Sequence, residues 1–224
     1  MKKFLTSAIL ALSAAAALAA SRPAPRLAIV QLQYGGGGDW YANPSGLPNL
    51  LRAIHERTGL DVVDRPVQLK LTDPAIWSYP YLYITGHGNI RFTDEEVQIL
   101  RKYLTSGGFL HADDNYGLDE SFRREMKRVF PDADLVELPQ SHAVYHVMYD
   151  LPHGLPKVHK HDGKPAQGFG IVQNGRVVVF YSYQSDLGNG WEDQERYNDA
   201  PEVREQALRM GVNLFLYAVA EVTQ

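Results

Sequence analysis

The stretch that decides the fold runs from Leu104 to Gly117 and reads Leu-Thr-Ser-Gly-Gly-Phe-Leu-His-Ala-Asp-Asp-Asn-Tyr-Gly. Its two adjacent glycines are typical of the left-handed turn that ends a helix. The apolar run that begins at Phe109 is too short for a helix and predicts a buried strand. Where that strand should leave the sheet, four polar residues follow within five positions: His111, Asp113, Asp114 and Asn115.

Ligands of open α/β sheets bind just outside the carboxyl ends of the strands, so this polar cluster is a candidate functional site. The same residues, followed by Gly117, also suit an ordinary turn. Both interpretations stay open at this point.

Predicted strands and helices alternate on both sides of this stretch. Thr93 and Glu96 form a capping box at the start of the best-defined helix, and Asn174-Gly175 is typical of a hairpin turn. Periodicity predicts strands over residues 27–33, 60–63 with 67–71, 81–85, 170–173 and 177–183, and helices over residues 47–57, 93–106, 119–130 and 201–222. The alternation predicts an α/β domain whose mainly parallel central sheet is covered on both faces.

One edge of this sheet should collect several polar loops. Right-handed crossovers would place the strand ends after Gln33, Thr85 and Ala112 on one rim. The glycine run 35–38, His87 and the polar cluster would then share one crevice. Aromatic side chains beside a carboxylate favour a sugar-stacking surface, although packing of such a loop onto the domain is the commoner outcome. The residues expected to bind a ligand are Asp39, Trp40, Tyr41, Asn115, His142 and Trp191.

The first twenty residues differ in composition from the rest. Lys2 and Lys3 precede an apolar run, and Ala17-Leu18-Ala19 fits the small-residue cleavage pattern of a secretory signal peptide. We therefore expect a signal peptide over residues 1–20, a linker over 21–26 and a single domain over 27–222. The expected location is periplasmic or secreted, with no stable membrane anchor after cleavage.

Charge and cysteine content exclude several classes of function. Without residues 1–20 the chain has 20 basic and 26 acidic side chains, and no basic patch stands out, so nucleic acid is not an expected partner. The chain contains no cysteine, which excludes disulfides, thiolate metal sites and a cysteine nucleophile. The remaining expected partner is a small polar ligand or a carbohydrate.

Histidines are unevenly distributed, since seven of the eight lie between His87 and His161. His142 and His146 are four residues apart, which on a helix would put both rings on one face. The HExxH pattern is absent, because no Glu stands between them. We predict no cofactor and leave a divalent metal open, with His111, Asp113, His142 and His146 as the candidate ligands.

The chain resembles the bacterial family of the domain of unknown function 4159, over about residues 27–220. The resemblance rests on several ordered motifs: Thr85-Gly86-His87-Gly88, Gly107-Gly108-Phe109-Leu110 leading into Asp113-Asp114, 121–126 with Phe130-Pro131, 142–151, Gly175-Arg176 and 186–191. That family is similar in fold to class I glutamine amidotransferases and trehalose-utilisation-type proteins. The resemblance therefore implies a flavodoxin-like three-layer sandwich.

Amidotransferases of that class carry a cysteine in a sharp turn between a strand and a helix. The matching strand end here holds Asp113 and Asp114, and the chain has no cysteine. The resemblance therefore implies a scaffold without glutaminase activity. Because a fold does not define a function, activity has to be argued from the site.

Three functional hypotheses remain open. The first is a domain that binds a polar ligand in a crevice at the strand carboxyl ends. The second is a hydrolase in which Asp113 or Asp114 acts with His87 or His111, with or without a metal, because paired carboxylates can supply one acid and one base. The third is a structural partner in an envelope assembly. Whether the protein is an enzyme is left open.

Overall fold

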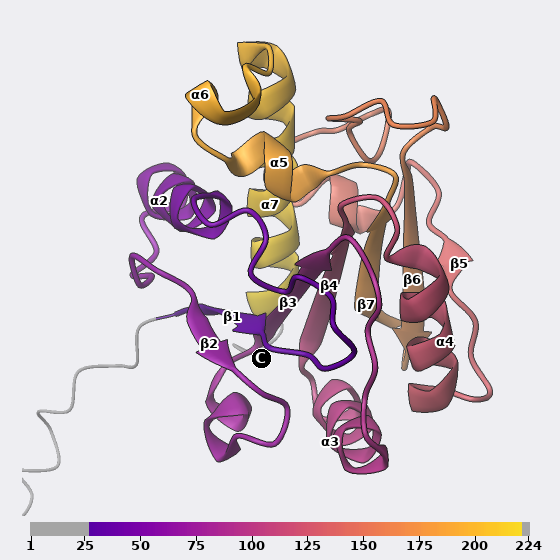
Figure 1. Cartoon of the computed structure of the whole chain (residues 1–224). Coiled ribbons are helices and arrows are strands. Elements are labelled where there is room, and N and C mark those ends of the chain that lie inside the picture. The colour runs from indigo at the N-terminus through magenta and orange to yellow at the C-terminus, as the bar shows by residue number, and fades with distance from the viewer. Residues whose placement is uncertain (1–26, 221–224) are drawn as a thin grey trace, which may run out of the picture.

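The computed structural model describes residues 27–220, and the segments expected to be a signal peptide and its linker lie outside them. A seven-stranded sheet, in the order β2-β1-β3-β4-β7-β6-β5, forms its centre (Figure 1). The strands are β1 (Ile29–Leu32), β2 (Val67–Leu69), β3 (Tyr81–Gly86), β4 (Phe109–Asp114), β5 (Val136–Glu137), β6 (Gln167–Gln173) and β7 (Arg176–Tyr183). Strands β2, β1, β3, β4 and β7 are parallel, whereas β6 is antiparallel to both of its neighbours.

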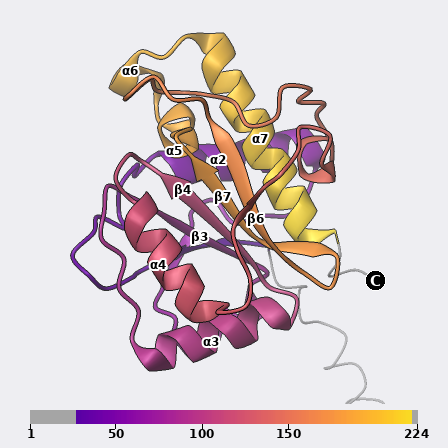
Figure 2. The ribbon, with the colours of Figure 1, turned by 90° about the vertical axis from the view of Figure 1, so that its right-hand side faces the viewer.

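Helices cover both faces of the sheet. The helices are α2 (Gly46–Thr58), α3 (Asp94–Thr105), α4 (Asp119–Val129), α5 (Leu187–Trp191), α6 (Gln194–Tyr197) and α7 (Pro201–Val219), with short 3₁₀ turns η1 (Pro74–Ser78) and η2 (Ala143–Tyr145). Helices α2, α5 and α7 pack together on one face, and α3 and α4 lie side by side on the other (Figure 2). This is the α/β three-layer sandwich, with the flavodoxin-like order of its five parallel strands.

Strand alternation divides the hydrophobic core into two clusters. On β3, Tyr81 and Tyr83 face the cluster under α2, α5 and α7, whereas Leu82 and Ile84 face the cluster under α3 and α4. All four side chains are buried. The sequence of β3 does not alternate between apolar and polar residues, because helices cover both faces of a central parallel strand.

Local signals in the sequence explain most element boundaries. The capping box of Thr93 and Glu96 is formed at the start of α3. Asn174 and Gly175 have φ angles of 52° and 81° and join β6 to β7. The predicted mainly parallel sheet is confirmed, as are the long helices.

One local prediction is wrong. In the segment 60–63 the pairing is limited to an isolated bridge between Val62 and Leu27, and β2 begins at Val67. His142 and His146 do not share a helix, because the residues between them form only the 3₁₀ turn η2. Among residues 27–220, no helix is long and apolar enough to span a membrane.

Candidate functional site

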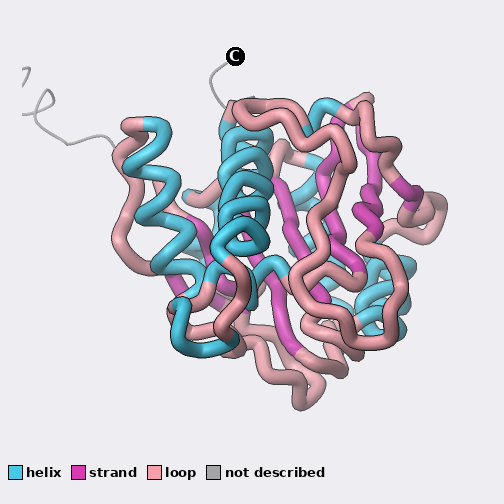
Figure 3. The backbone as a smooth tube through the Cα atoms, turned by 90° about the horizontal axis from the view of Figure 1, so that it is seen from above, coloured by secondary structure: helices cyan, strands magenta, loops and turns pink. Residues whose placement is uncertain are grey.

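Because β1, β3, β4 and β7 are parallel, the loops that follow them lie at one edge of the sheet, which we call the carboxyl edge. These loops comprise residues 33–45, 87–93, 115–118 and 184–186. Figure 3 shows the molecule from above, with helices on either side of the strands. The chain order reverses between β1 and β3, which are adjacent and parallel. Such a switch point is where open α/β sheets leave room for a ligand, because the two following loops run to opposite faces.

Asp39 and His87 meet at this switch point. The Asp39 carboxylate accepts the His87 backbone N–H at 2.6 Å, and its other oxygen lies 2.8 Å from His87 Nδ1. Burial raises the pKa of Asp39, but the hydrogen bonds from His87 outweigh it and hold that pKa below its usual value. Gly86, with φ 141°, permits this approach, because a Cβ there would lie 2.8 Å from Asp39 Oδ1.

Asp113 lies below the carboxyl edge and is fully buried. Its carboxylate accepts four hydrogen bonds, from the Ser182 hydroxyl at 2.6 Å, the Tyr83 hydroxyl at 3.3 Å and the backbone N–H groups of Leu187 at 3.1 Å and Gly188 at 2.7 Å. Burial raises its pKa to about 7, against the effect of these donors. The carboxylate therefore anchors the first turn of α5 and has no face toward solvent.

His111 is also fully buried, on the same face of β4 as Asp113. Its Nδ1 lies 3.0 Å from the Tyr81 hydroxyl and its Nε2 lies 2.9 Å from the Ser182 hydroxyl. Burial lowers its pKa to about 3, so the imidazole is neutral at ordinary pH. His111 is thus a core hydrogen-bonding residue rather than part of the exposed edge.

Asp114 and Asn115 reach the carboxyl edge itself. Asp114 Oδ1 accepts the Leu118 N–H at 3.0 Å at the start of α4, and Asn115 Oδ1 accepts from Asn43 Nδ2 at 3.3 Å. The other side-chain atoms, Asp114 Oδ2 and Asn115 Nδ2, are buried and make no hydrogen bond in the described structure. Burial raises the pKa of Asp114. One acceptor and one donor, on consecutive residues, are therefore left without partners in the described structure.

A second cluster, which we call the His–Asp cluster, consists of His159, His161 and Asp186. The ligand atoms of the three side chains lie within 4.8 Å of one another. His161 Nε2 contacts Asp186 Oδ2, and His159 Nδ1 lies 3.6 Å from that same oxygen. Burial, followed by the charge of Asp114, raises the pKa of Asp186 to about 7.

Backbone strain accumulates at this edge. Tyr116, Gln184 and Asp186 have positive φ angles of 75°, 59° and 61°, which non-glycine residues rarely adopt. The Tyr116 ring stacks on the His161 ring with centroids 4.6 Å apart and remains 46% exposed. Strained residues persist where surrounding contacts hold them, and they gather at functional sites.

Several residues expected at the site lie elsewhere. Trp191 is fully buried and donates its indole N–H to Ala207 O at 2.8 Å, so it belongs to the core under α7. His142 lies near Tyr217, whose hydroxyl accepts the Val177 N–H at the start of β7. It is therefore at the opposite edge of the sheet.

Three further residues are placed as follows. His146 pairs with Asp150 at 2.6 Å on the surface and does not join His111 or His142. Trp40 packs partly onto the core, and Tyr41, which is 63% exposed, contacts it edge-on.

The sequence interpretation missed the His–Asp cluster. His159 and His161 stand in a Pro/Gly/Lys-rich segment without a periodic pattern, and Asp186 follows β7 some 25 residues later. Two features of the sequence could have indicated this cluster: the two histidines of His159-Lys160-His161, and the polar loop that follows the last predicted strand. Their proximity depends on a long-range contact that neither segment encodes alone.

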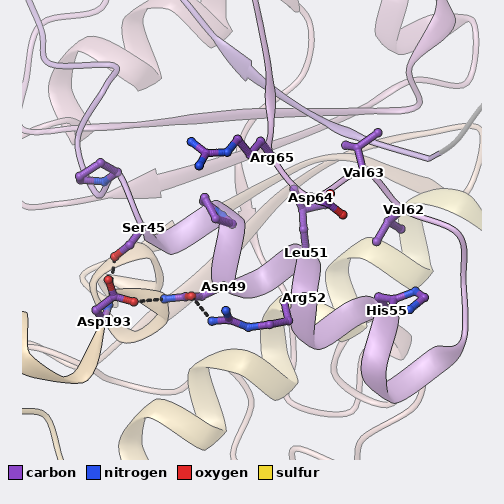
Figure 4. Close-up of a pocket in the computed structure, with 12 residues that line it drawn as sticks. Ser45, Asn49, Leu51, Arg52, His55, Val62, Val63, Asp64, Arg65 and Asp193 are labelled. Atoms are coloured by element: carbon purple, nitrogen blue, oxygen red, sulfur yellow. Dashed lines mark hydrogen bonds between the residues drawn. The ribbon is translucent and has the colours of Figure 1, made fainter.

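The protein also has a pocket of about 600 Å³ beside α2 (Figure 4). It shares no residue with the His–Asp cluster or with Asp114 and Asn115. Several of its polar groups bond one another: the Asn49 side chain donates to the Asp193 carboxylate at 2.9 Å, and the Asp193 backbone N–H donates to Ser45 Oγ at 3.0 Å. The carboxyl edge, where buried groups lack partners, is therefore the stronger candidate.

Comparison with protein families gives a match over nearly all of the described residues. A family model described as "Domain of unknown function (DUF4159)" covers residues 28–219. No curated protein matches the chain.

Proposed function

The chain belongs to the DUF4159 family of domains of unknown function, and we propose that it binds a small polar ligand at the carboxyl edge, without glutaminase activity. The observation that carries this proposal is the pair of unused groups on Asp114 and Asn115. Buried polar atoms in folded proteins are almost always hydrogen-bonded, because leaving one unpaired costs about 1–3 kcal/mol. A bound ligand would remove this cost.

The chemistry of the pair favours a hydroxylated ligand such as a carbohydrate. Each hydroxyl group both donates and accepts a hydrogen bond, so a ligand with several hydroxyls can match both a carboxylate oxygen and an amide N–H. Tyr116 adds an exposed aromatic ring at the carboxyl edge. The hydrogen-bonded pair of Asp39 and His87 lies at the switch point of the same edge. The mixture of acidic and basic groups also suits a neutral ligand better than a highly charged one.

The test is calorimetry with a panel of glucose, mannose, N-acetylglucosamine, a disaccharide and glycerol. We expect at least one member to bind with one site per chain. Replacing Asp114 by Asn should weaken binding by about tenfold to a hundredfold, the range for a hydrogen bond to a charged group. Asp134→Asn is the matched control, because Asp134 is an exposed acid just beyond the end of α4 that pairs with Lys127.

The outcome that contradicts the proposal is equally definite. Either no member of the panel binds at about 10 mM, or binding persists unchanged in both Asp114→Asn and Asn115→Ala. In the first case ordered water satisfies the two groups, as it does for many buried polar atoms.

Hydrolysis at the same edge is the second candidate. It is favoured by the raised pKa values of Asp114 and Asp186: burial raises both, the charge of Asp119 adds to the effect at Asp114, and the charge of Asp114 adds to it at Asp186. Asp114, rather than the enclosed Asp113, would then act as the acid or base. Release of product from chromogenic glycosides and esters by the wild type, with loss in Asp114→Asn, would establish it.

We also propose that the protein is exported, on the strength of the charged start and apolar run of residues 1–20. Fractionation of cells that express the full chain tests this. The expected result is a shortened form outside the cytoplasm, and an uncleaved cytoplasmic form would contradict it.

A further inference from the structure

The His–Asp cluster has the composition of a metal site. Two imidazoles and one carboxylate leave coordination positions open and suit first-row transition metals such as zinc or iron better than Mg²⁺ or Ca²⁺, which prefer oxygen ligands. We propose that His159, His161 and Asp186 bind one divalent transition-metal ion at the carboxyl edge. This inference goes beyond the proposed ligand site, which consists of Asp114, Asn115 and their surroundings.

The first support is the carboxylate of Asp186. Its side chain is completely buried, Oδ2 faces both histidines, and Oδ1 makes no hydrogen bond in the described structure. A buried carboxylate is stable only when it is paired or when it coordinates a metal. The two histidines pair with one of its oxygens and leave the other without a partner.

The second support is the carboxylate behind His159. His159 Nδ1 faces Asp186, whereas His159 Nε2 lies 3.3 Å from Asp199 Oδ1. A metal-binding histidine usually donates its other ring N–H to a carboxylate, which fixes the tautomer and orients the ring. Asp199 occupies that position, outside the cluster itself.

The third support is Asn189, which is 5% exposed. Its Nδ2 lies 3.0 Å from His159 Nδ1, and its Oδ1 has no partner in the described structure. The two ends of an amide exchange by rotation about the last side-chain bond. Rotation would release the lone pair of His159 Nδ1 and turn an oxygen acceptor toward the cluster.

Access and charge are compatible with metal entry. The imidazoles of His159 and His161 are 22% and 27% exposed, so the cluster opens to solvent on their side. Asp114 and Asp199 add negative charge nearby. The positive charge of Lys157 disfavours a bound cation, and its Nζ donates a hydrogen bond to Gln184 Oε1 at 3.4 Å.

The experiment is titration of the chain, prepared without a histidine tag and stripped with EDTA, with Zn²⁺ by calorimetry and with Co²⁺ by visible absorption. We expect one equivalent to bind. His159→Gln and His161→Gln should each weaken binding at least about a hundredfold, and Asp199→Asn by about tenfold to a hundredfold. His146→Gln is the matched control, because His146 also pairs with an aspartate but lies outside the cluster.

Binding of much less than one equivalent at about 100-fold excess metal would overturn the inference. It would also be overturned if both histidine variants bound the metal as tightly as the wild type. Circular dichroism of each variant excludes loss of fold as the cause. The metal and ligand proposals fail separately: sugar binding in the EDTA-treated protein tests the ligand site alone, and Zn²⁺ binding in Asn115→Ala tests the metal site alone.

Discussion

Asp113 and Asp114 are consecutive residues of β4 whose carboxylates face opposite sides of the sheet, because side chains alternate along a strand. Asp113 points toward α5 and accepts four hydrogen bonds, whereas Asp114 retains an unpaired oxygen at the carboxyl edge. The two residues therefore have separate roles. Asp113 supports the loop that carries Asp186, whereas Asp114 keeps one buried oxygen without a partner for the ligand that we propose.

The role of Asp113 leads to a stability prediction. In Asp113→Asn, an amide NH₂ group would replace one carboxylate oxygen. This group is itself a donor, so the donors that it faces would be left unpaired. The free energy of unfolding should fall by about 1–3 kcal/mol, the cost of leaving buried donors unpaired. Urea unfolding measures it, with Asp134→Asn as the exposed control. A change below about 0.5 kcal/mol would show that the carboxylate does not anchor α5.

The same residue predicts a pH dependence. The pKa of Asp113 rises from its ordinary value of 3.8 to about 7 on folding, so between these values the folded state binds more protons than the unfolded state. Its contribution to stability therefore decreases as pH rises from about 4 to about 7. Unfolding free energies across this range should decline less steeply in Asp113→Asn than in the wild type. Equal slopes would contradict the raised pKa.

At the scale of elements, the short helix α5 connects the site to the core. It has only five residues, and Trp191 at its end packs under α7 and bonds to Ala207. Its first turn bonds to Asp113. A helix this short is not stable alone, so these tertiary contacts hold it, and the position of Asp186 before it depends on them.

Gly211 tests the packing that holds α5. A Cβ on Gly211 of α7 would lie 2.5 Å from Leu50 Cδ1 of α2 and 3.0 Å from Trp191 Cζ2. Although alanine favours a helix by about 1 kcal/mol over glycine, overpacking costs about 1–3 kcal/mol. We therefore expect Gly211→Ala to lower the melting temperature, while Gln206→Ala, at an exposed position of α7, leaves it nearly unchanged. A stabilised Gly211→Ala would show that this contact is loose.

At the scale of the whole molecule, local signals were sufficient for the layers of the fold and insufficient for the site. Hydrophobic periodicity, the Thr93 cap and the Asn174-Gly175 turn are encoded within a few residues, so they predicted the parallel sheet and its hairpin. Strand alternation puts His111 and Asp113 on one face of β4, but it does not say which helices cover that face. The approach of His159 and His161 to Asp186 depends on long-range packing.

The carboxyl edge therefore combines a switch point, unpaired buried groups and strained loops, whereas in the pocket beside α2 Ser45, Asn49, Arg52 and Asp193 bond to one another (Figure 4). A ligand that selects the folded state at this edge should also raise the melting temperature with its concentration, by mass action. The location of binding separates this account from any other site on the molecule.

Mapping amide chemical shifts by ¹H–¹⁵N NMR, during titration with each member of the sugar and glycerol panel, tests this location most directly. The account predicts shifts confined to the carboxyl edge, above all at His87, Asn115, Tyr116 and Asp186. Shifts at Asn49, Arg52 and Arg65 beside α2 with the carboxyl edge unchanged, or no shifts with any member of the panel, would contradict it.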